Sequence, residues 1–211
     1  MKNIVQLLFV WAILSSCGRF ELNDGDLLFC VAESSAMSDA IVNATQTGDT
    51  NQYDHVAVCV HEGNVPMVIE AHPQYGVVRR PLTEFLDDAA VIDGKKGVMV
   101  MRVKESLLAA VDVEKAVKRV EGCVGQPYDW SFLPNNGKLY CSELVYECYL
   151  NEDESPVFDS NPMTFKDKEG NTPEFWVELF KNNGEEIPEG VPGTNPNDMI
   201  KAKILEEVYC Y

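Results

Sequence analysis

A ten-residue stretch decides the fold, and it reads Tyr140-Cys141-Ser142-Glu143-Leu144-Val145-Tyr146-Glu147-Cys148-Tyr149. A loop containing Pro, Asn and Gly precedes it, and apolar side chains then recur at helical spacing at Leu144, Val145 and Cys148. This pattern predicts that Cys141 lies in the first turn of a helix. The N–H groups and partial positive charge of a helix N-terminus stabilise a thiolate and can hold an oxyanion. We therefore interpret Cys141 as a candidate nucleophile.

The chain contains three histidines that are candidates for the base of this nucleophile. His55 begins an apolar strand-like run, where burial of an imidazole is costly unless it has a partner. Glu70, on the strand expected to return from that run, can orient the ring of His55 through a hydrogen bond. His72 shares a strand face with Glu70 and is a rival for the orienting role. His61 lies at the expected hairpin end and is predicted to face solvent.

The length and composition predict one globular domain with an acidic surface. The chain has 211 residues, 45% of them hydrophobic, with a formal net charge of −17 and a pI near 4.5. This charge argues against nucleic acid as a partner, because nucleic-acid binding relies on basic patches. The histidines are sparse and no CxxC or HExxH pattern occurs, so we expect no metal and no cofactor.

The N-terminus has the pattern of a secretory signal. One lysine precedes a short apolar run, and the run ends at Leu14-Ser15-Ser16-Cys17. These four residues resemble a bacterial lipobox, which predicts a signal peptide over residues 1–16, lipid attachment at Cys17 and a mature domain over residues 17–211. The expected location is the bacterial cell envelope, with the lipid anchor in a membrane. The alternative is an ordinary signal peptide and a periplasmic or secreted protein.

The remaining chain alternates short strands and helices. Apolar runs predict strands over residues 27–32, 54–61, 67–72, 76–81 and 97–103. Helical spacing predicts helices over residues 34–45, 82–90, 113–120 and 173–182, with Asp112 as a cap for the third. In the last of these helices Phe175, Trp176, Leu179 and Phe180 mark an apolar face, which either packs in the core or lines an acyl pocket.

Several of these segments occur in an order that resembles a known family. The segments are Gly25-Asp26-Leu27-Leu28-Phe29, Asp54-His55-Val56-Ala57-Val58, Ile69-Glu70-Ala71, Gly125-Gln126-Pro127-Tyr128-Asp129 and Tyr140-Cys141-Ser142-Glu143-Leu144-Val145. Together they resemble the YiiX/YebB-like proteins, which are circularly permuted papain-like cysteine hydrolases related to NlpC-type endopeptidases. The resemblance extends to a closing Pro/Gly segment near residues 187–198.

The resemblance implies an α+β fold in which an antiparallel sheet or half-open barrel packs against the helix of Cys141. It also implies that Cys141 attacks, that His55 is the base and that Glu70 orients His55. The oxyanion donors would be the Cys141 backbone N–H and a second group, for which Tyr53 and Tyr140 are candidates. The chain order His, Glu, Cys is compatible with a triad, because a triad is defined by geometry.

The implied reaction is hydrolysis of an amide or ester bond through a thioester. The substrate stays open between a cell-wall peptide and an N-acyl or lipid-derived compound. A non-catalytic lipoprotein that binds such a ligand in the same cleft is the main alternative. A structural lipoprotein is a third possibility, and it would require Cys141 to form a disulfide, for example with Cys123.

Overall fold

The structure is a computed structural model that describes residues 20–45, 51–108 and 110–211. The signal peptide and Cys17 predicted from the sequence lie outside these residues. Within the described ranges, none of the helices is long and apolar enough to cross a bilayer.

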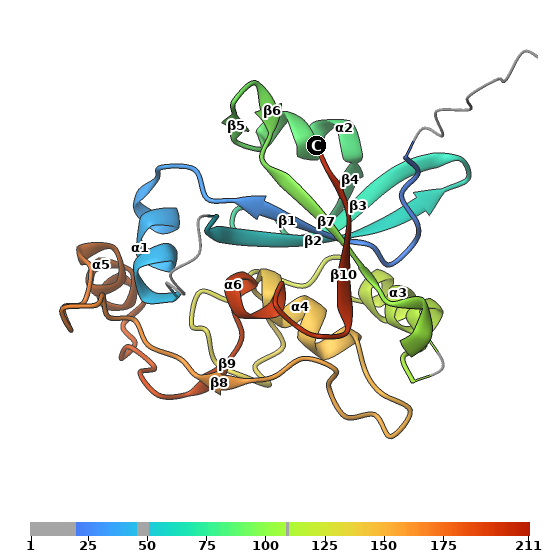
Figure 1. Cartoon of the computed structure of the whole chain (residues 1–211). Helices are drawn as coiled ribbons and strands as arrows, with labels where there is room; N and C mark the ends of the chain where they lie inside the picture. Colours follow the sequence, from blue (N-terminus) through green and yellow to red (C-terminus); the bar gives the residue numbers. More distant parts are fainter. Residues whose placement is uncertain (1–19, 46–50, 109) are drawn as a thin grey trace, which may run out of the picture.

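Six strands form one antiparallel sheet in the order β10-β7-β1-β2-β3-β4 (Figure 1). The strand bounds are β1 Leu27–Val31, β2 Tyr53–Glu62, β3 Val65–His72, β4 Gly76–Pro81, β7 Val98–Val103 and β10 Leu205–Cys210. Two-residue strands form two further antiparallel pairs, β5 Val91–Ile92 with β6 Lys95–Lys96 and β8 Asn161–Pro162 with β9 Pro192–Gly193. The predicted α+β class is confirmed, and the sheet is open.

Helices cover both faces of this sheet. They are α1 Ala36–Thr45, α2 Leu82–Asp88, α3 Val113–Gly122, α4 Cys141–Cys148, α5 Glu174–Asn183 and α6 Pro196–Met199, with a 3-10 turn at Glu105–Leu107. The helices α3, α4 and α6 lie on one side of the sheet and α2 on the other, while α1 and α5 lie side by side at one end (Figure 1). This arrangement explains why β2 is apolar on both faces: alternate residues pack into two separate cores.

The cap and turn residues act locally as the sequence predicts. The Asp112 carboxylate accepts a hydrogen bond from the Lys115 backbone N–H at 3.0 Å and caps α3. The buried Asp26 carboxylate, in the segment that enters β1, is held by the Arg102 side chain at 2.6 and 2.7 Å. This pair fixes the turn before β1 to the neighbouring strand β7.

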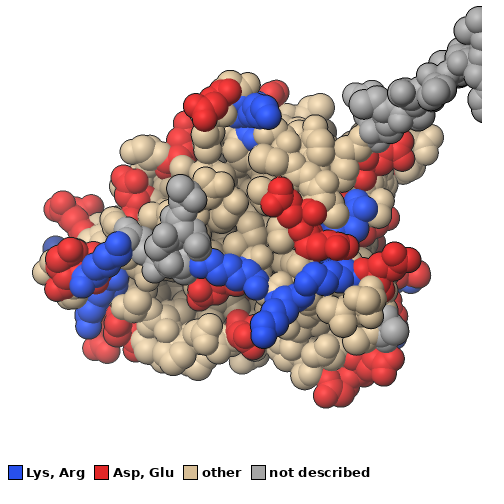
Figure 2. Space-filling view, in the orientation of Figure 1, with Lys and Arg blue, Asp and Glu red and all other residues tan. Residues whose placement is uncertain are grey.

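The acidic charge is distributed over the surface. On the face that Figure 2 shows, Asp and Glu side chains lie over several elements, with Lys and Arg between them. The net charge of −17 therefore does not gather into one patch on this face.

Candidate active site

The start of α4 places Cys141 against the sheet. Cys141 is the first residue of α4 and is 6% exposed, and its Sγ lies 3.9 Å from the Asp54 carbonyl oxygen at the entrance of β2. The predicted position in the first helical turn is confirmed. Its sulfur therefore lies where the N-terminal N–H groups of α4 and the first residues of β2 meet.

His55 lies beside Cys141 and is bonded to Glu70. The His55 Nε2 contacts the Glu70 Oε2, which leaves Nδ1 as the ring nitrogen available to the Cys141 thiol. Burial lowers the pKa of His55, but the Glu70 carboxylate and the hydrogen bond with Cys141 outweigh this effect, so its pKa lies well above the usual 6.5. The Glu70 carboxylate therefore favours the protonated form of the imidazole, which the ring reaches when it accepts the Cys141 proton.

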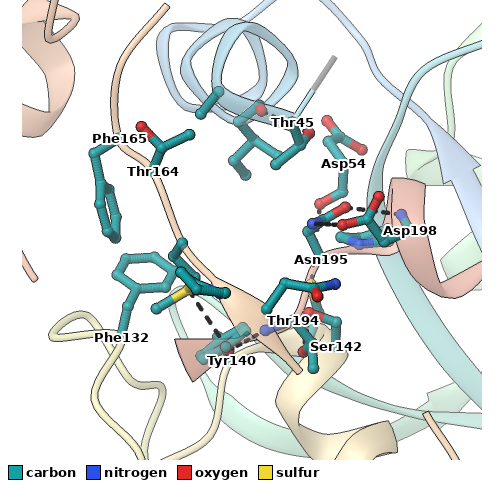
Figure 3. A pocket seen from close by; sticks show the side chains of 18 of the residues that line it. Thr45, Asp54, Phe132, Tyr140, Ser142, Thr164, Phe165, Thr194, Asn195 and Asp198 are labelled. Atoms are coloured by element: carbon teal, nitrogen blue, oxygen red, sulfur yellow. Dashed lines mark hydrogen bonds between the residues drawn. The ribbon is translucent and has the colours of Figure 1, made fainter. Parts of the chain in front are cut away.

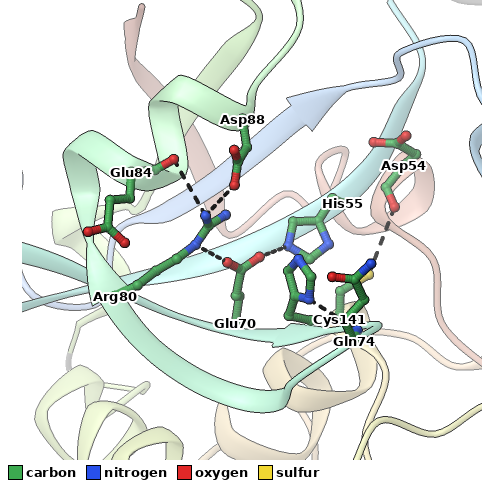
Figure 4. A network of polar contacts seen from close by, with 9 residues as sticks. Asp54, His55, Glu70, Gln74, Arg80, Glu84, Asp88 and Cys141 are labelled. Atoms are coloured by element: carbon green, nitrogen blue, oxygen red, sulfur yellow. Dashed lines mark hydrogen bonds and ion pairs between the residues drawn. The ribbon is translucent and has the colours of Figure 1, made fainter.

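The Glu70 carboxylate continues into a network that the sequence reasoning missed. Its second oxygen, Oε1, accepts a hydrogen bond from the Arg80 Nε at 2.5 Å, and the Arg80 Nη1 contacts Asp88 (Figure 4). Glu70 is 1% exposed; burial opposes its ionisation, yet His55 first and then Arg80 lower its pKa to about 2. Glu70 is thus a fixed negative charge with both oxygens occupied.

The other two histidines take different positions. His72 does not hold His55; its Nδ1 accepts a hydrogen bond from the Gln74 backbone N–H at 3.1 Å and its ring stacks on Tyr75. His61 is only partly exposed and contacts Asp24 at 2.7 Å, so the predicted solvent-facing position holds only in part. Of Glu70 and His72, the two candidates for orienting His55, the structure places Glu70 in contact with the His55 ring.

The loop before Cys141 is organised by a buried carboxylate. Asp129 accepts hydrogen bonds from the backbone N–H groups of Ser131 and Leu133, each at 2.9 Å, and from the Asn136 side chain. These bonds hold Phe132 at a φ of 52°, a backbone conformation that bulky residues rarely adopt. The loop that leads into α4 is therefore fixed before any ligand binds.

The same loop places Tyr128 next to the nucleophile. The Gly125 N–H donates to the Val77 carbonyl in β4 and the Val77 N–H donates to the Gln126 carbonyl, each at 2.8 Å. Two residues after Gln126, Tyr128 lines the cavity that contains Cys141. The Tyr128 hydroxyl has no hydrogen-bond partner among the described residues, and burial and then Cys141 raise the pKa of this tyrosine well above 10. Tyr128 was part of the quoted Gly-Gln-Pro-Tyr-Asp segment, but its role depends on a contact between distant segments.

The two tyrosines predicted as oxyanion donors differ in position. Tyr140 lines the cavity with Cys141, but its hydroxyl already accepts a hydrogen bond from the Thr194 backbone N–H at 3.0 Å. Tyr53 is buried against Phe29 and lines a different hollow, next to Asn197. Tyr53 is not among the residues that line the cavity with Cys141, so the geometry gives no support to its predicted role as an oxyanion donor.

An apolar cavity of about 280 Å³ opens at Cys141. Side chains from several separate parts of the chain surround it, among them Phe132, Phe165, Thr45 and Asp54 (Figure 3). Of the four apolar residues predicted on α5, only Trp176 lines this cavity, and the other three pack in or against the core. The Trp176 Nε1 is buried and has no hydrogen-bond partner in the described part of the chain.

A second cavity of about 310 Å³, with more charged side chains in its lining than the first, lies on the His55 side. Its lining includes charged and hydroxyl side chains, namely Glu33, Ser34, Ser35, Ser38, His55, Glu70, His72, Arg80 and Asp88. Asp54 lines both cavities, and the Ser38 hydroxyl holds its carboxylate at 2.5 Å. The two cavities therefore meet near the Cys141–His55 pair, and most of the charged side chains lie on the His55 side.

The six described cysteines are free thiols. Cys141 forms no disulfide, and Cys123 lies next to Cys148 instead, with the two sulfurs 3.9 Å apart. The pairing of Cys141 with Cys123, which the structural-lipoprotein alternative requires, does not occur in this structure.

Comparisons with known proteins agree with this geometry. Residues 21–209 match the family described as permuted papain-like amidase enzymes, YaeF/YiiX, C92 family. The uncharacterized protein YiiX of Escherichia coli (strain K12) is 29% identical over 211 residues, covering 99% of this chain and 96% of that protein. A crystal structure described as that of the metalloprotein yiiX from Escherichia coli O157:H7 superposes with a TM-score of 0.71 at 26% identity, covering 91% of this chain and 99% of the other.

Proposed function

The chain belongs to the C92 family of permuted papain-like amidases, and from this premise we propose that it is a cysteine hydrolase that cleaves an amide or ester bond through a thioester intermediate. The single observation that carries the proposal is the contact series from Cys141 through His55 to Glu70. A buried carboxylate with a low pKa, an imidazole with a raised pKa and a sulfur at a helix N-terminus are the three parts that thiol hydrolysis needs.

The proposed roles follow from these positions. His55 takes the Cys141 proton, and the thiolate attacks the substrate carbonyl. The oxyanion forms near the Cys141 backbone N–H, which donates the first hydrogen bond to it. We propose the Tyr128 hydroxyl as the second donor to the oxyanion, with the Tyr140 hydroxyl as the alternative. His55 then protonates the leaving group and activates the water that hydrolyses the thioester, while Glu70 keeps its ring in place.

The two cavities support a division of the substrate. The acyl part is bonded to Cys141 in the thioester, so it occupies the cavity that contains this residue, where Phe132, Phe165 and Trp176 are part of the lining. The leaving group receives its proton from His55, so it occupies the second cavity, whose lining has more charged side chains. We therefore propose a substrate with an apolar acyl group and a polar amine or alcohol, which favours an N-acyl or lipid-derived compound over a cell-wall peptide.

The cell-envelope location and the lipid anchor at Cys17 are part of the proposal. They rest on the signal-like residues 1–16 and the Leu14-Ser15-Ser16-Cys17 pattern. Mass spectrometry of the N-terminal peptide of protein isolated from bacterial membranes tests this, because a diacylglycerol adduct on a new N-terminal Cys17 is expected. An unmodified N-terminus elsewhere would contradict the anchor.

The proposed reaction uses protein groups alone. The related yiiX structure is described as that of a metalloprotein. In the described ranges of this chain, no group of three or more His, Cys, Asp or Glu side chains is arranged to hold a metal ion. The donor set of the described residues therefore does not fit a metal site.

Hydrolysis assays on N-acyl amino acids of increasing chain length and on muropeptides, run in parallel, test the function. We expect the wild-type protein and the Cys210→Ala control to hydrolyse the N-acyl compounds, and Cys141→Ala to be inactive. Release from muropeptides alone would contradict the apolar acyl group. Tight binding by both wild type and Cys141→Ala, with no turnover by either, would favour the non-catalytic binding module.

A further inference from the structure

Two cysteines outside the candidate active site face each other between neighbouring helices. Cys123 is the C-cap of α3 and Cys148 is the last residue of α4, and their sulfur atoms are 3.9 Å apart. The two helices pack against each other, so the pair bridges their C-terminal ends. A bond of about 2.05 Å forms between two sulfurs by small changes in side-chain rotation and backbone position when they start in contact.

The other described cysteines do not compete for this pairing. Cys141 lies at the opposite end of α4, seven residues away, which corresponds to about 10 Å along the helix axis. Cys59 and Cys30 belong to the core on the other face of the sheet, and Cys210 lies exposed on β10. Cys123 and Cys148 therefore have each other as nearest thiol partner.

The two thiols are unequal, which suits stepwise exchange. Cys148 is 2% exposed, whereas Cys123 is only partly buried and reachable from solvent. The hydrogen bond from the Cys148 thiol lowers the pKa of Cys123 to about 7, while this contact and burial raise the pKa of Cys148. Cys123 is therefore the thiol that attacks an external disulfide at neutral pH, and Cys148 is the one that resolves the mixed disulfide.

We propose that Cys123 and Cys148 are a disulfide-forming pair that fastens α3 to the C-terminal end of the helix that carries Cys141. The oxidant is a disulfide compound, either a small molecule or a protein. The Cys123 thiolate attacks one of its sulfurs, breaks its S–S bond and releases the first thiol. Cys148 then loses its proton and attacks the Cys123 sulfur, which releases the second thiol. The two cysteines are oxidised by two electrons and the oxidant is reduced to two thiols.

The bond would close a loop that contains much of the site. Residues 124–147 lie between the two cysteines, and they include Tyr128, Asp129 and Cys141. Cross-linking this loop removes conformational entropy from the unfolded chain. We expect the oxidised protein to melt about 10 °C higher than the reduced protein.

Peptide mapping by mass spectrometry tests the pair without any activity assay. The full chain is reduced, exchanged into oxidised glutathione at pH 7.5, alkylated without reduction and digested. We expect a linked peptide pair containing Cys123 and Cys148, while Cys141 and Cys210 are not linked to either. The Cys148→Ala variant should stop at one glutathione on Cys123, and Cys210→Ser should behave as wild type.

Three results would overturn the inference in the wild-type protein. In the first, Cys123 and Cys148 are both alkylated as free thiols after the exchange. In the second, Cys123 keeps a glutathione adduct while Cys148 stays a free thiol. In the third, either residue is linked to Cys141. Because the readout is the thiol state of the wild-type chain, it does not depend on the proposed hydrolysis or on the folding of a variant.

Discussion

The Arg80 Nε donates a hydrogen bond to the Glu70 Oε1 at 2.5 Å, while the other oxygen of Glu70 contacts the ring of His55. Arg80 lies on the edge strand β4, so the sheet carries a polar series from its edge to the sulfur of Cys141. One buried carboxylate therefore both orients the proposed base and depends on a cation for its own charge.

Replacement of Glu70 by Gln should remove the negative charge that orients His55. We expect kcat/KM for the best substrate to fall by about 10²-fold or more, because the amide no longer favours the required tautomer and the imidazolium. The free energy of unfolding should fall by about 3 kcal/mol, since Arg80 loses a buried partner. Steady-state kinetics and urea unfolding measure the two effects, and unchanged kinetics in a folded variant would contradict the role of Glu70.

Replacement of Arg80 by Gln should shift acid unfolding. Arg80 helps to lower the pKa of Glu70 to about 2 from 4.5, so ionised Glu70 contributes stability that is present above pH 4.5 and is lost as pH falls toward 2. Without Arg80 the pKa of Glu70 in the folded protein should rise toward 4.5, so the stabilisation is lost at a higher pH. We therefore expect the pH at the midpoint of acid unfolding to rise by up to about one unit.

Arg79 provides the matched control for that variant. It is the preceding residue of β4, and it pairs with Glu121 at the surface. Arg79→Gln should leave the acid midpoint almost unchanged, because exposed ion pairs contribute about 0–1 kcal/mol. Circular dichroism against pH gives the acid-unfolding midpoint of each variant. Equal shifts of the midpoint in Arg80→Gln and Arg79→Gln would mean that the loss of a surface charge alone causes the shift.

Replacement of Tyr128 by Phe should lower kcat and leave the thiol intact. Tyr128 lines the cavity with Cys141 and its hydroxyl has no hydrogen-bond partner among the described residues, so we propose that this hydroxyl donates to the oxyanion. We expect kcat to fall by about 10–100-fold with an unchanged rate of Cys141 alkylation. Tyr75→Phe, at an exposed position, is the control. A fall in the alkylation rate instead would indicate that Tyr128 acts on the sulfur environment.

Replacement of Glu143 by Gln should change how stability depends on pH. Burial and then the neighbouring Asp129 raise the pKa of Glu143 from 4.5 to about 8. Between pH 4.5 and 8 the unfolded chain loses this proton while the folded chain keeps it, so wild-type stability falls as pH rises through this window. The variant should lack this fall and should be more stable than wild type at pH 8 by on the order of 2 kcal/mol. Urea unfolding at pH 5 and pH 8 gives the difference in the free energy of unfolding between the variant and the wild type. The same difference at both pH values would contradict the raised pKa of Glu143.

The local patterns of the sequence predicted the elements well. The apolar runs around His55 and Glu70 predicted two neighbouring strands, and the capping and spacing around Asp112 and Cys141 predicted two helices with the observed starts. These signals are local, because they depend on spacing within one element. The family resemblance then connected them, and residues 21–209 match that family.

The parts that were missed depend on contacts between distant segments. Arg80 meets Glu70 only because β4 pairs with β3. Tyr128 shares a cavity with Cys141, and the segment before it is held by the pairing of Gly125 and Gln126 with Val77. The apolar cavity likewise combines residues near 41, 132, 163 and 194. The apolar face of α5 could not be assigned from the sequence for the same reason. Helical spacing does not tell which apolar residues line a cavity and which pack in the core.

The rate of Cys141 alkylation against pH, followed by mass spectrometry for wild type and His55→Ala, tests the central claim most directly. If His55 and Cys141 form an activated pair, wild-type Cys141 should react rapidly at pH 6, and His55→Ala should lose that reactivity. A wild-type rate that rises only near pH 8, as for a free cysteine, and that is unchanged in His55→Ala would contradict the account.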